Sequence, residues 1–187
     1  DEGMWTYDYF PSSKVKDAYG FNPSPEWLNH AQLSSARLAA GCSGSFVSPQ
    51  GLVLTNHHCA LRCLEQLSTA KRDLMNSGFY ARAESAEIPC PAYEINQLVE
   101  ISDITNRINS ATQGLEGERY STALKAEMSK VEKECAASDT VRCDAVTLYH
   151  GGQYSLYKYR RYQDVRLVFA PEFAAAFFGG DPDNFTF

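Results

Sequence analysis

The spacing of apolar residues along this chain changes between a helical period and an alternating one, and the change marks the predicted elements. Helical spacing recurs in three stretches. Ser24 and Pro25, a favoured N-cap followed by a favoured first helical residue, begin the earliest of them. The helices are predicted at residues 25–40, 60–75 and 103–133, the last with a break near Gly114 and Gly117.

Alternation of apolar and polar residues predicts the strands. Residues 45–47 and 52–55 flank the turn Ser48-Pro49-Gln50-Gly51, in which Pro49 presets φ and Gly51 permits the positive φ that closes a turn. This stretch therefore predicts a β-hairpin. Further strands are expected at residues 93–102, 146–149, 154–161 and 165–169, the second and third joined by a Gly151-Gly152 turn. Residues 84–93 and 179–184 are expected to be loops, and residues 1–22 an ordered arm.

Together these elements predict a mainly β fold with helical insertions. The length of 187 residues suits one domain or one lobe of a larger protein, and a hydrophobic content of 44% is enough for a buried core. The formal net charge of −6 argues against nucleic acid as a partner. No apolar run reaches the roughly 18–20 residues that a membrane span needs. The chain begins at Asp1 and not at Met, which agrees with removal of a signal peptide, although a piece cut from a longer sequence would look the same.

The six cysteines favour disulfides, because an even count in a secreted chain is typical of a disulfide framework. No Cys-x-x-Cys and no four-ligand zinc spacing occurs in the sequence. Cys42 and Cys59 are the best-supported pair, since they stand on either side of the predicted hairpin. Elimination would then pair Cys63 with Cys90 and Cys135 with Cys143. Connectivity does not follow from sequence, so free buried thiols stay open as an alternative.

The predicted hairpin ends in two histidines, His57 and His58. Imidazole is the commonest general base in enzymes, and it works only when it is held in place. A disulfide between Cys42 and Cys59 would tie the ends of the hairpin together and fix the direction of His58. This layout resembles the histidine-bearing hairpin of chymotrypsin-like serine proteases, in which Ser, His and Asp act together.

Two other groups of residues have simpler structural interpretations. His30 lies on the first predicted helix and His150 in a turn, and with the two hairpin histidines they give no metal-ligand spacing, so neither a metal nor another cofactor is expected. Aromatic and basic residues alternate near the end of the chain, which would suit stacking on bases. At this net charge a packed strand is the simpler interpretation. These residues are Tyr154, Tyr157, Lys158, Tyr159, Arg160, Arg161 and Tyr162.

Three segments carry a family resemblance. They are residues 1–5 (Asp-Glu-Gly-Met-Trp), 51–59 (Gly-Leu-Val-Leu-Thr-Asn-His-His-Cys) and 177–187 (Phe-Phe-Gly-Gly-Asp-Pro-Asp-Asn-Phe-Thr-Phe). In this order they resemble the mature start, the histidine segment and the Gly-Gly-Asp-x-Asp-Asn-Phe segment of the dipeptidyl-peptidase 7 and dipeptidyl-peptidase 11 family of bacterial serine exopeptidases. The resemblance spans the whole chain.

The resemblance implies one lobe of a chymotrypsin-like double β-barrel, with residues 1–187 as the N-terminal part of a peptidase catalytic domain. His58 matches the catalytic base, and His57 is its structural neighbour. The family's second barrel, which carries the serine nucleophile, and its helical cap are absent from this sequence. The family's catalytic Asp follows the Asp-Asn-Phe segment, so it is expected beyond Phe187.

No nucleophile is identified within the chain, which contains no Gly-x-Ser-x-Gly elbow. Ser43 and Ser45 lie in a segment that superficially resembles a nucleophile loop, but the segment fits the first strand of the hairpin better. Asp181 and Asp183 are interpreted as loop-shaping residues, because Asp side chains commonly bond to nearby backbone in turns. A bond between Asp183 and the ring of His58 would contradict that interpretation.

The resemblance also assigns a substrate-binding role to Asn184 and Phe185, which match residues that hold the free N-terminus of the peptide. An amide oxygen can accept from an ammonium group, and an aromatic face adds cation–π attraction. One alternative stays open, namely that Asn184 only stabilises a tight turn. Asn184-Phe185-Thr186 is also a glycosylation sequon, but glycosylation is discounted for a chain that resembles bacterial proteins.

The implied function is removal of dipeptides from oligopeptides with a free N-terminus. The implied enzyme is a homodimer in the periplasm or at the surface of a Gram-negative bacterium, after removal of a signal peptide. Two other hypotheses are a chymotrypsin-like endopeptidase, which would not depend on a free N-terminus, and a non-catalytic peptide-binding or structural fragment. A fragment that carries the histidine without the nucleophile cannot form an acyl-enzyme, so taken alone it would behave as the last hypothesis states.

Overall fold

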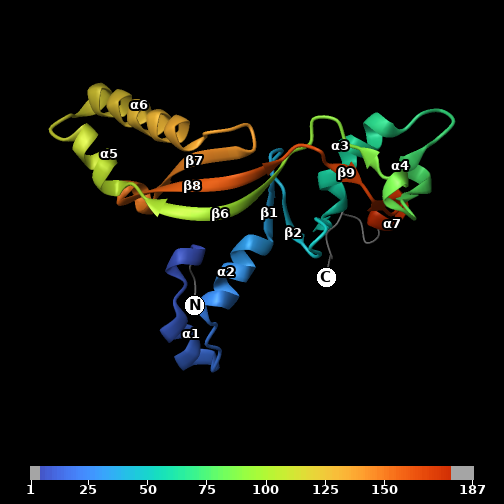
Figure 1. The fold of residues 1–187 in the computed structure, drawn as a ribbon, viewed down its shortest axis with the longest axis horizontal. Helices are drawn as coiled ribbons and strands as arrows, with labels where there is room; N and C mark the ends of the chain where they lie inside the picture. The colour runs from blue at the N-terminus through green and yellow to red at the C-terminus, as the bar shows by residue number, and fades with distance from the viewer. Residues whose placement is uncertain (1–4, 178–187) are drawn as a thin grey trace. The chain divides into compact units, whose positions relative to one another are not determined.

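A computed structural model describes residues 5–177 of the chain as a mixed fold of helices and sheets (Figure 1). The helices are α1 (Ser12–Tyr19), α2 (Pro25–Ser34), α3 (His57–Leu67), α4 (Leu74–Ser77), α5 (Thr105–Thr112), α6 (Gly117–Cys135) and α7 (Phe173–Ala176). The strands are β1 (Ser35–Leu38), β2 (Ser43–Phe46), β3 (Val53–Thr55), β4 (Phe79–Tyr80), β5 (Ile88–Pro89), β6 (Ile95–Asp103), β7 (Val141–Leu148), β8 (Gln153–Tyr162), β9 (Arg166–Leu167) and β10 (Phe169–Ala170).

The strands form one large sheet and two small ones. The large sheet has the order β3-β2-β1-β6-β8-β7, and β4 pairs with β10 and β5 with β9 in two-stranded sheets. With seven helices beside these strands, the described residues are mixed helix and sheet, and the prediction of a mainly β fold gave the helices too little weight. The large sheet has β3 and β7 at its edges, so these residues do not confirm a chymotrypsin-like double barrel.

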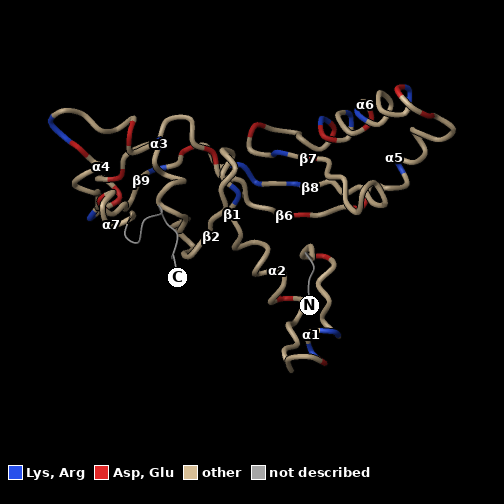
Figure 2. The backbone as a smooth tube through the Cα atoms, turned by 180° about the vertical axis from the view of Figure 1, so that it is seen from behind, with Lys and Arg blue, Asp and Glu red and all other residues tan. Residues whose placement is uncertain are grey.

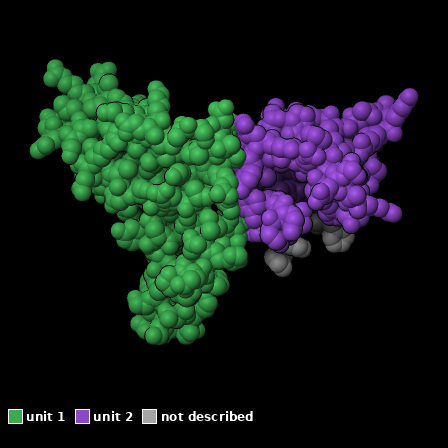
Figure 3. All heavy atoms as spheres, viewed as in Figure 1, with its two compact units in different colours: residues 1–35, 97–161 green, residues 36–96, 162–187 purple. Residues whose placement is uncertain are grey.

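Of the described residues, 5–35 and 97–161 form one compact unit, drawn in green in Figure 3. Its core consists of Ile104, Ile108, Val131 and Tyr154. The long strands β7 and β8 pair antiparallel from Val141↔Arg160 to Leu148↔Gln153. Helix α6 packs against β7, and α5 packs against α6. A disulfide between Cys135 and Cys143 ties the end of α6 to β7.

In this unit, charged residues lie along the surface helix α6, whereas two tyrosines of β8 are buried. Figure 2 shows Lys, Arg, Asp and Glu interspersed along α6, as on a solvated helix face. On β8, Tyr154 and Tyr159 are 2% and 6% exposed, which supports a packed strand over a stacking platform for bases. The hydroxyl groups of Tyr120 and Tyr154 are 3.0 Å apart, and the pKa of Tyr154 is raised by this hydrogen bond and by burial.

Of the described residues, 36–96 and 162–177 form the second unit, drawn in purple in Figure 3. It has two buried clusters. One lies around Cys63, Leu64 and Leu167, and the other around Ala36, Leu38 and Cys59. A disulfide joins Cys63 to Cys90, and another joins Cys42 to Cys59. The three disulfides are thus the pairs expected from the hairpin and by elimination.

Several predicted elements are confirmed. The hairpin of residues 45–55 is β2 and β3, with Ser45 opposite Leu54. The strand of residues 93–102 is β6. The later hairpin is β7 and β8, and each of these two strands is longer than predicted. The helical pattern of residues 103–133 is α5 and α6, interrupted before Gly117 as the glycines indicated.

Other predictions were wrong, and each error has a local cause. The first helix ends at Ser34 and not near residue 40, because Ala36 and Leu38 alternate in burial along β1. The helix predicted at residues 60–75 ends at Leu67. Ser68 stops it: its hydroxyl donates to the carbonyl of Leu64 (2.8 Å) and accepts from the amide of Leu74 (3.1 Å).

The remaining differences concern short elements. The N-terminal arm contains α1, the loop of residues 84–93 contains β5, and the strand of residues 165–169 is divided between β9 and β10. Two-residue strands leave too short an alternation to be read from sequence. None of the described helices is both long and apolar enough to cross a membrane.

Candidate active site

The β2–β3 hairpin brings the chain to the two histidines. Gly51 closes its turn with φ +89°, and the hydroxyl of Ser48 accepts from the amide of Leu52 at 3.1 Å. At the other end, the hydroxyl of Thr55 donates to the carbonyl of Ser43 at 2.7 Å. A Cβ at Gly44 would lie 2.6 Å from the carbonyl oxygen of Leu54, so only glycine permits this close approach. The hairpin therefore has a fixed end from which α3 begins.

His57 and His58 are the first two residues of α3 and not the last of a strand, which corrects their predicted place. Asn56, with extended φ/ψ of −73° and 151°, is the N-cap, and its carbonyl accepts from the amide of Cys59 at 3.1 Å. Successive residues of a helix point in different directions. The two neighbouring imidazoles therefore have different surroundings.

His57 lies against apolar surroundings. Both of its ring nitrogens are buried, and its ring centroid is 6.2 Å from that of Phe173 at the start of α7. His58 is exposed. Of the two, only His58 presents its imidazole to solvent, where a substrate could reach it.

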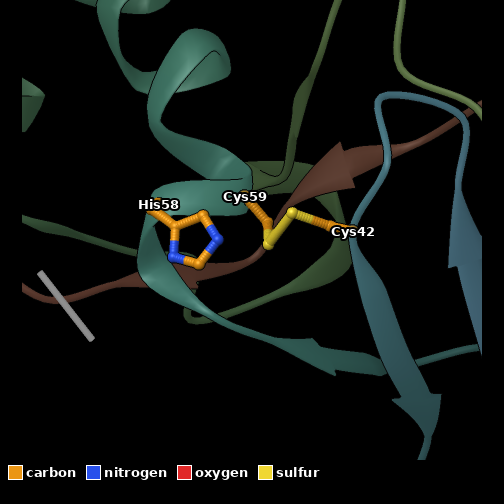
Figure 4. Close-up of side chains that lie close together, drawn as sticks. All are labelled: Cys42, His58 and Cys59. Carbon is orange, nitrogen blue, oxygen red and sulfur yellow. A yellow bond between two sulfur atoms is a disulfide. The ribbon is translucent and has the colours of Figure 1, made fainter. Parts of the chain in front are cut away.

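A disulfide fixes the helix turn that carries His58. Cys42 precedes β2 and Cys59 follows His58, with a Cα–Cα distance of 6.0 Å across the bond. Figure 4 shows the ring of His58 beside this disulfide. A nitrogen of His58 and the sulfurs of Cys42 and Cys59 all lie within 4.8 Å of one another. Both sulfurs are consumed by the disulfide, so in this state they are not thiolate ligands for a metal.

The hydroxyl of Tyr93 also holds this helix. Its hydroxyl donates to the carbonyl of Cys59 (2.9 Å) and is within 3.2 Å of the amide of Cys63, from which it accepts. Cys63 is in turn joined to Cys90. The first turns of α3 are therefore held by two disulfides and a tyrosine. Nothing in the sequence pattern singled out Tyr93.

The other predicted site residues are not brought to His58 by the described part of the chain. Ser43 lies in β2 opposite β3, with its carbonyl bonded to Thr55, as the strand interpretation required. His30 is exposed on α2, with its Nε2 3.5 Å from the hydroxyl of Ser34. His150 lies in the tight connection between β7 and β8 with φ +54°. Asp181, Asp183, Asn184 and Phe185 lie outside the described residues.

The sequence profile of the peptidase S46 family matches residues 1–187. The chain belongs to the peptidase S46 family. Its relatives in the family include a dipeptidyl-peptidase 7 of Porphyromonas endodontalis, 34% identical over 98% of this chain and 24% of the relative. An Asp/Glu-specific dipeptidyl-peptidase of Shewanella putrefaciens is 31% identical over the whole chain and 26% of its own length. The chain thus spans about a quarter of the length of these relatives.

Solved structures of a related protein agree with the fold. The crystal structure of Porphyromonas endodontalis DPP11 in complex with the dipeptide Arg-Glu matches 91% of this chain and 24% of its own, with a TM-score of 0.70 and 29% identity. The same protein in complex with the dipeptide Arg-Asp matches with the same TM-score and identity. Family and fold therefore agree with the resemblance carried by the three sequence segments.

Proposed function

We propose that the protein carrying this chain is a serine-type dipeptidyl-peptidase that removes dipeptides from the N-termini of oligopeptides. The observation that carries the proposal is His58, an exposed imidazole on a disulfide-held helix turn in an S46-family chain. A general base needs this combination of access and fixed position. In this role His58 takes the proton from the nucleophilic serine and returns it to the leaving amine.

The proposal assigns the remaining catalytic groups to the part of the enzyme outside residues 1–187. These residues form the N-terminal part of the catalytic domain and the histidine-bearing lobe of a chymotrypsin-like fold. The second lobe supplies the serine, and an aspartate beyond Phe187 orients His58. The chain covers 24% of the length of the dipeptidyl-peptidase 7 of Porphyromonas endodontalis. The rest of such a protein is long enough to contain both the second lobe and the aspartate.

Substrate binding is proposed for Asn184 and Phe185 on the basis of the family segment. An enzyme that cuts after two residues must recognise the substrate's amine, and an amide oxygen with an aromatic face suits an ammonium group. Relatives named dipeptidyl-peptidase 7 and Asp/Glu-specific dipeptidyl-peptidase both match this chain, so the preference for an apolar or acidic residue is not assigned. A homodimer in the periplasm or at the cell surface completes the proposal.

The test is release of dipeptides from two peptides of one sequence, one with a free and one with an acetylated N-terminus. The full-length protein should act only on the free peptide. His58→Ala should lower kcat/KM by at least about 10³-fold, since it removes a base whose contribution with its partners is of this order. His30→Ala, the control on exposed α2, should keep full activity.

Each contrary outcome points to a different error. Cleavage of the acetylated peptide would indicate an endopeptidase. Activity that survives His58→Ala would mean that the base is another residue. No cleavage of either peptide by the unaltered protein would favour the non-catalytic hypothesis.

A further inference from the structure

We propose that Cys42, His58 and Cys59 form a zinc-class metal site when the disulfide between the two cysteines is reduced. Within residues 5–177 this is the only group of three His, Cys, Asp or Glu side chains whose ligand atoms lie close enough to share an ion. The proposal concerns binding by the reduced chain, and it can be tested without reference to peptidase activity.

The geometry needs little rearrangement. In a tetrahedral zinc site with Zn–S near 2.3 Å and Zn–N near 2.0 Å, neighbouring ligand atoms are about 3.5–3.8 Å apart. The two sulfurs and the nitrogen of His58 already lie within 4.8 Å of one another. Breaking the S–S bond lets the sulfurs separate to the required spacing, while the Cα atoms, 6.0 Å apart, keep the two side chains close to each other.

The backbone around the three residues is held independently of this disulfide. Cys42 stands at the start of the hairpin, whose strands pair from Gly44↔Thr55 to Phe46↔Val53. Tyr93 holds the backbone of Cys59 through its carbonyl, and the Cys63–Cys90 disulfide holds the next turn of α3. Reduction of one bond therefore leaves the ligands close together.

Access and ligand chemistry favour an open site. His58 is exposed, Cys42 is half-buried and Cys59 is 8% exposed, whereas both cysteines of the neighbouring disulfide, Cys63 and Cys90, are buried. Two thiolates and one imidazole are ligands typical of zinc, and three protein ligands leave a fourth position for water. A bound metal would occupy the imidazole that the proposed function uses as a base, so the reduced, metal-loaded form would be inactive.

The reaction balances in two steps. A phosphine reductant gives two electrons to the disulfide and takes an oxygen atom from water, which yields a phosphine oxide and two thiols. The metal ion then displaces one proton from each thiol and binds the neutral imidazole, so two protons are released for each ion bound. A cellular dithiol would perform the first step by becoming a disulfide itself.

The test is titration of the intact protein with Co²⁺, which gives thiolate charge-transfer absorption in the near ultraviolet when cysteine binds it. In the presence of a phosphine, one Co²⁺ should bind per chain and be displaced by Zn²⁺. Without the phosphine, no such band should appear. His58→Ala and Cys42→Ser should each weaken binding by at least about tenfold. The matched controls, His30→Ala and the Cys135→Ala/Cys143→Ala pair, should bind as the unaltered protein does.

A further variant keeps the proposal testable if reduction unfolds the chain. Cys42→His removes the disulfide without any reductant and leaves two imidazoles and one thiolate at the same place, with the other two disulfides intact. It should bind Co²⁺ under non-reducing conditions, and Cys42→Ala should bind it at least about tenfold more weakly. The absence of cobalt binding by both the reduced protein and Cys42→His would overturn the proposal. So would equal binding by His58→Ala.

Discussion

The hydroxyl of Tyr93 connects two backbone groups of the helix that carries the histidines. Tyr93→Phe keeps the ring and removes both hydrogen bonds, leaving the carbonyl of Cys59 and the amide of Cys63 without this partner. We expect the free energy of unfolding to fall by about 1–3 kcal/mol, because buried polar groups lose their bonds. Urea unfolding of the two proteins measures this change in the free energy of unfolding.

The control for this substitution is Tyr80→Phe, whose ring is 65% exposed. That change should alter stability by less than about 0.5 kcal/mol. Equal effects of the two substitutions would mean that the Tyr93 hydroxyl does not hold α3.

Turn chemistry and the order of residues made part of the site predictable. Gly51, the paired cysteines and the adjacent histidines are all local signals within residues 42–59. Tyr93 meets Cys59 across 34 residues of sequence, and Phe173 meets His57 from still farther along the chain. Contacts of this kind depend on tertiary packing, which a periodicity analysis does not contain.

At the scale of elements, Arg107 joins α5 to α6. Its guanidinium donates to Glu127 (2.7 Å) and Glu134 (2.8 Å), and the hydrogen bond from Arg107 holds the pKa of Glu134 below its ordinary value. A carboxyl group with a lowered pKa in the folded state stabilises the fold above its unfolded pKa. That contribution is lost as the pH falls through the folded value.

Arg107→Gln should therefore lower the thermal midpoint slightly at pH 7. The difference from the unaltered protein should shrink as the pH falls below the ordinary glutamate value of about 4.3. Thermal unfolding followed by circular dichroism at several pH values measures this. Arg119→Gln, at an exposed position of α6, should show no such pH-dependent difference. A constant offset for Arg107→Gln at all pH values would exclude the ion pairs as its cause.

Helices and strands were predicted correctly where one hydrophobic period, helical or alternating, continued over many residues. The helical pattern of residues 103–133 is confirmed by α5 and α6, and β8 by the alternating tyrosines. It failed at residues 35–38, where four alternating residues follow a helix directly and their burial in β1 outweighs helix propensity. The stop after Leu67 depends on the Ser68 hydroxyl, whose second partner, Leu74, lies beyond the turn.

At the scale of the whole molecule, the chain has two compact units and each has buried clusters of its own residues. Each unit also contains its own disulfides: Cys135–Cys143 in one, and Cys42–Cys59 and Cys63–Cys90 in the other. A disulfide stabilises by restricting the unfolded chain, and more so for longer loops. Sequence separations of 8 and 27 residues correspond to about 2–3 and 3–4 kcal/mol.

Because the buried clusters are separate, removing one disulfide should loosen one unit. Amide hydrogen exchange of Cys135→Ala/Cys143→Ala should rise in α6 and β7 and stay unchanged in α3 and the hairpin of β2 and β3. Cys63→Ala/Cys90→Ala should show the reverse, with the larger effect expected of its longer loop. Exchange that rose equally in both units for either variant would show that they unfold as one cooperative body. The stability of the His58 turn would then depend on the whole chain, and not only on the disulfides and the tyrosine beside it.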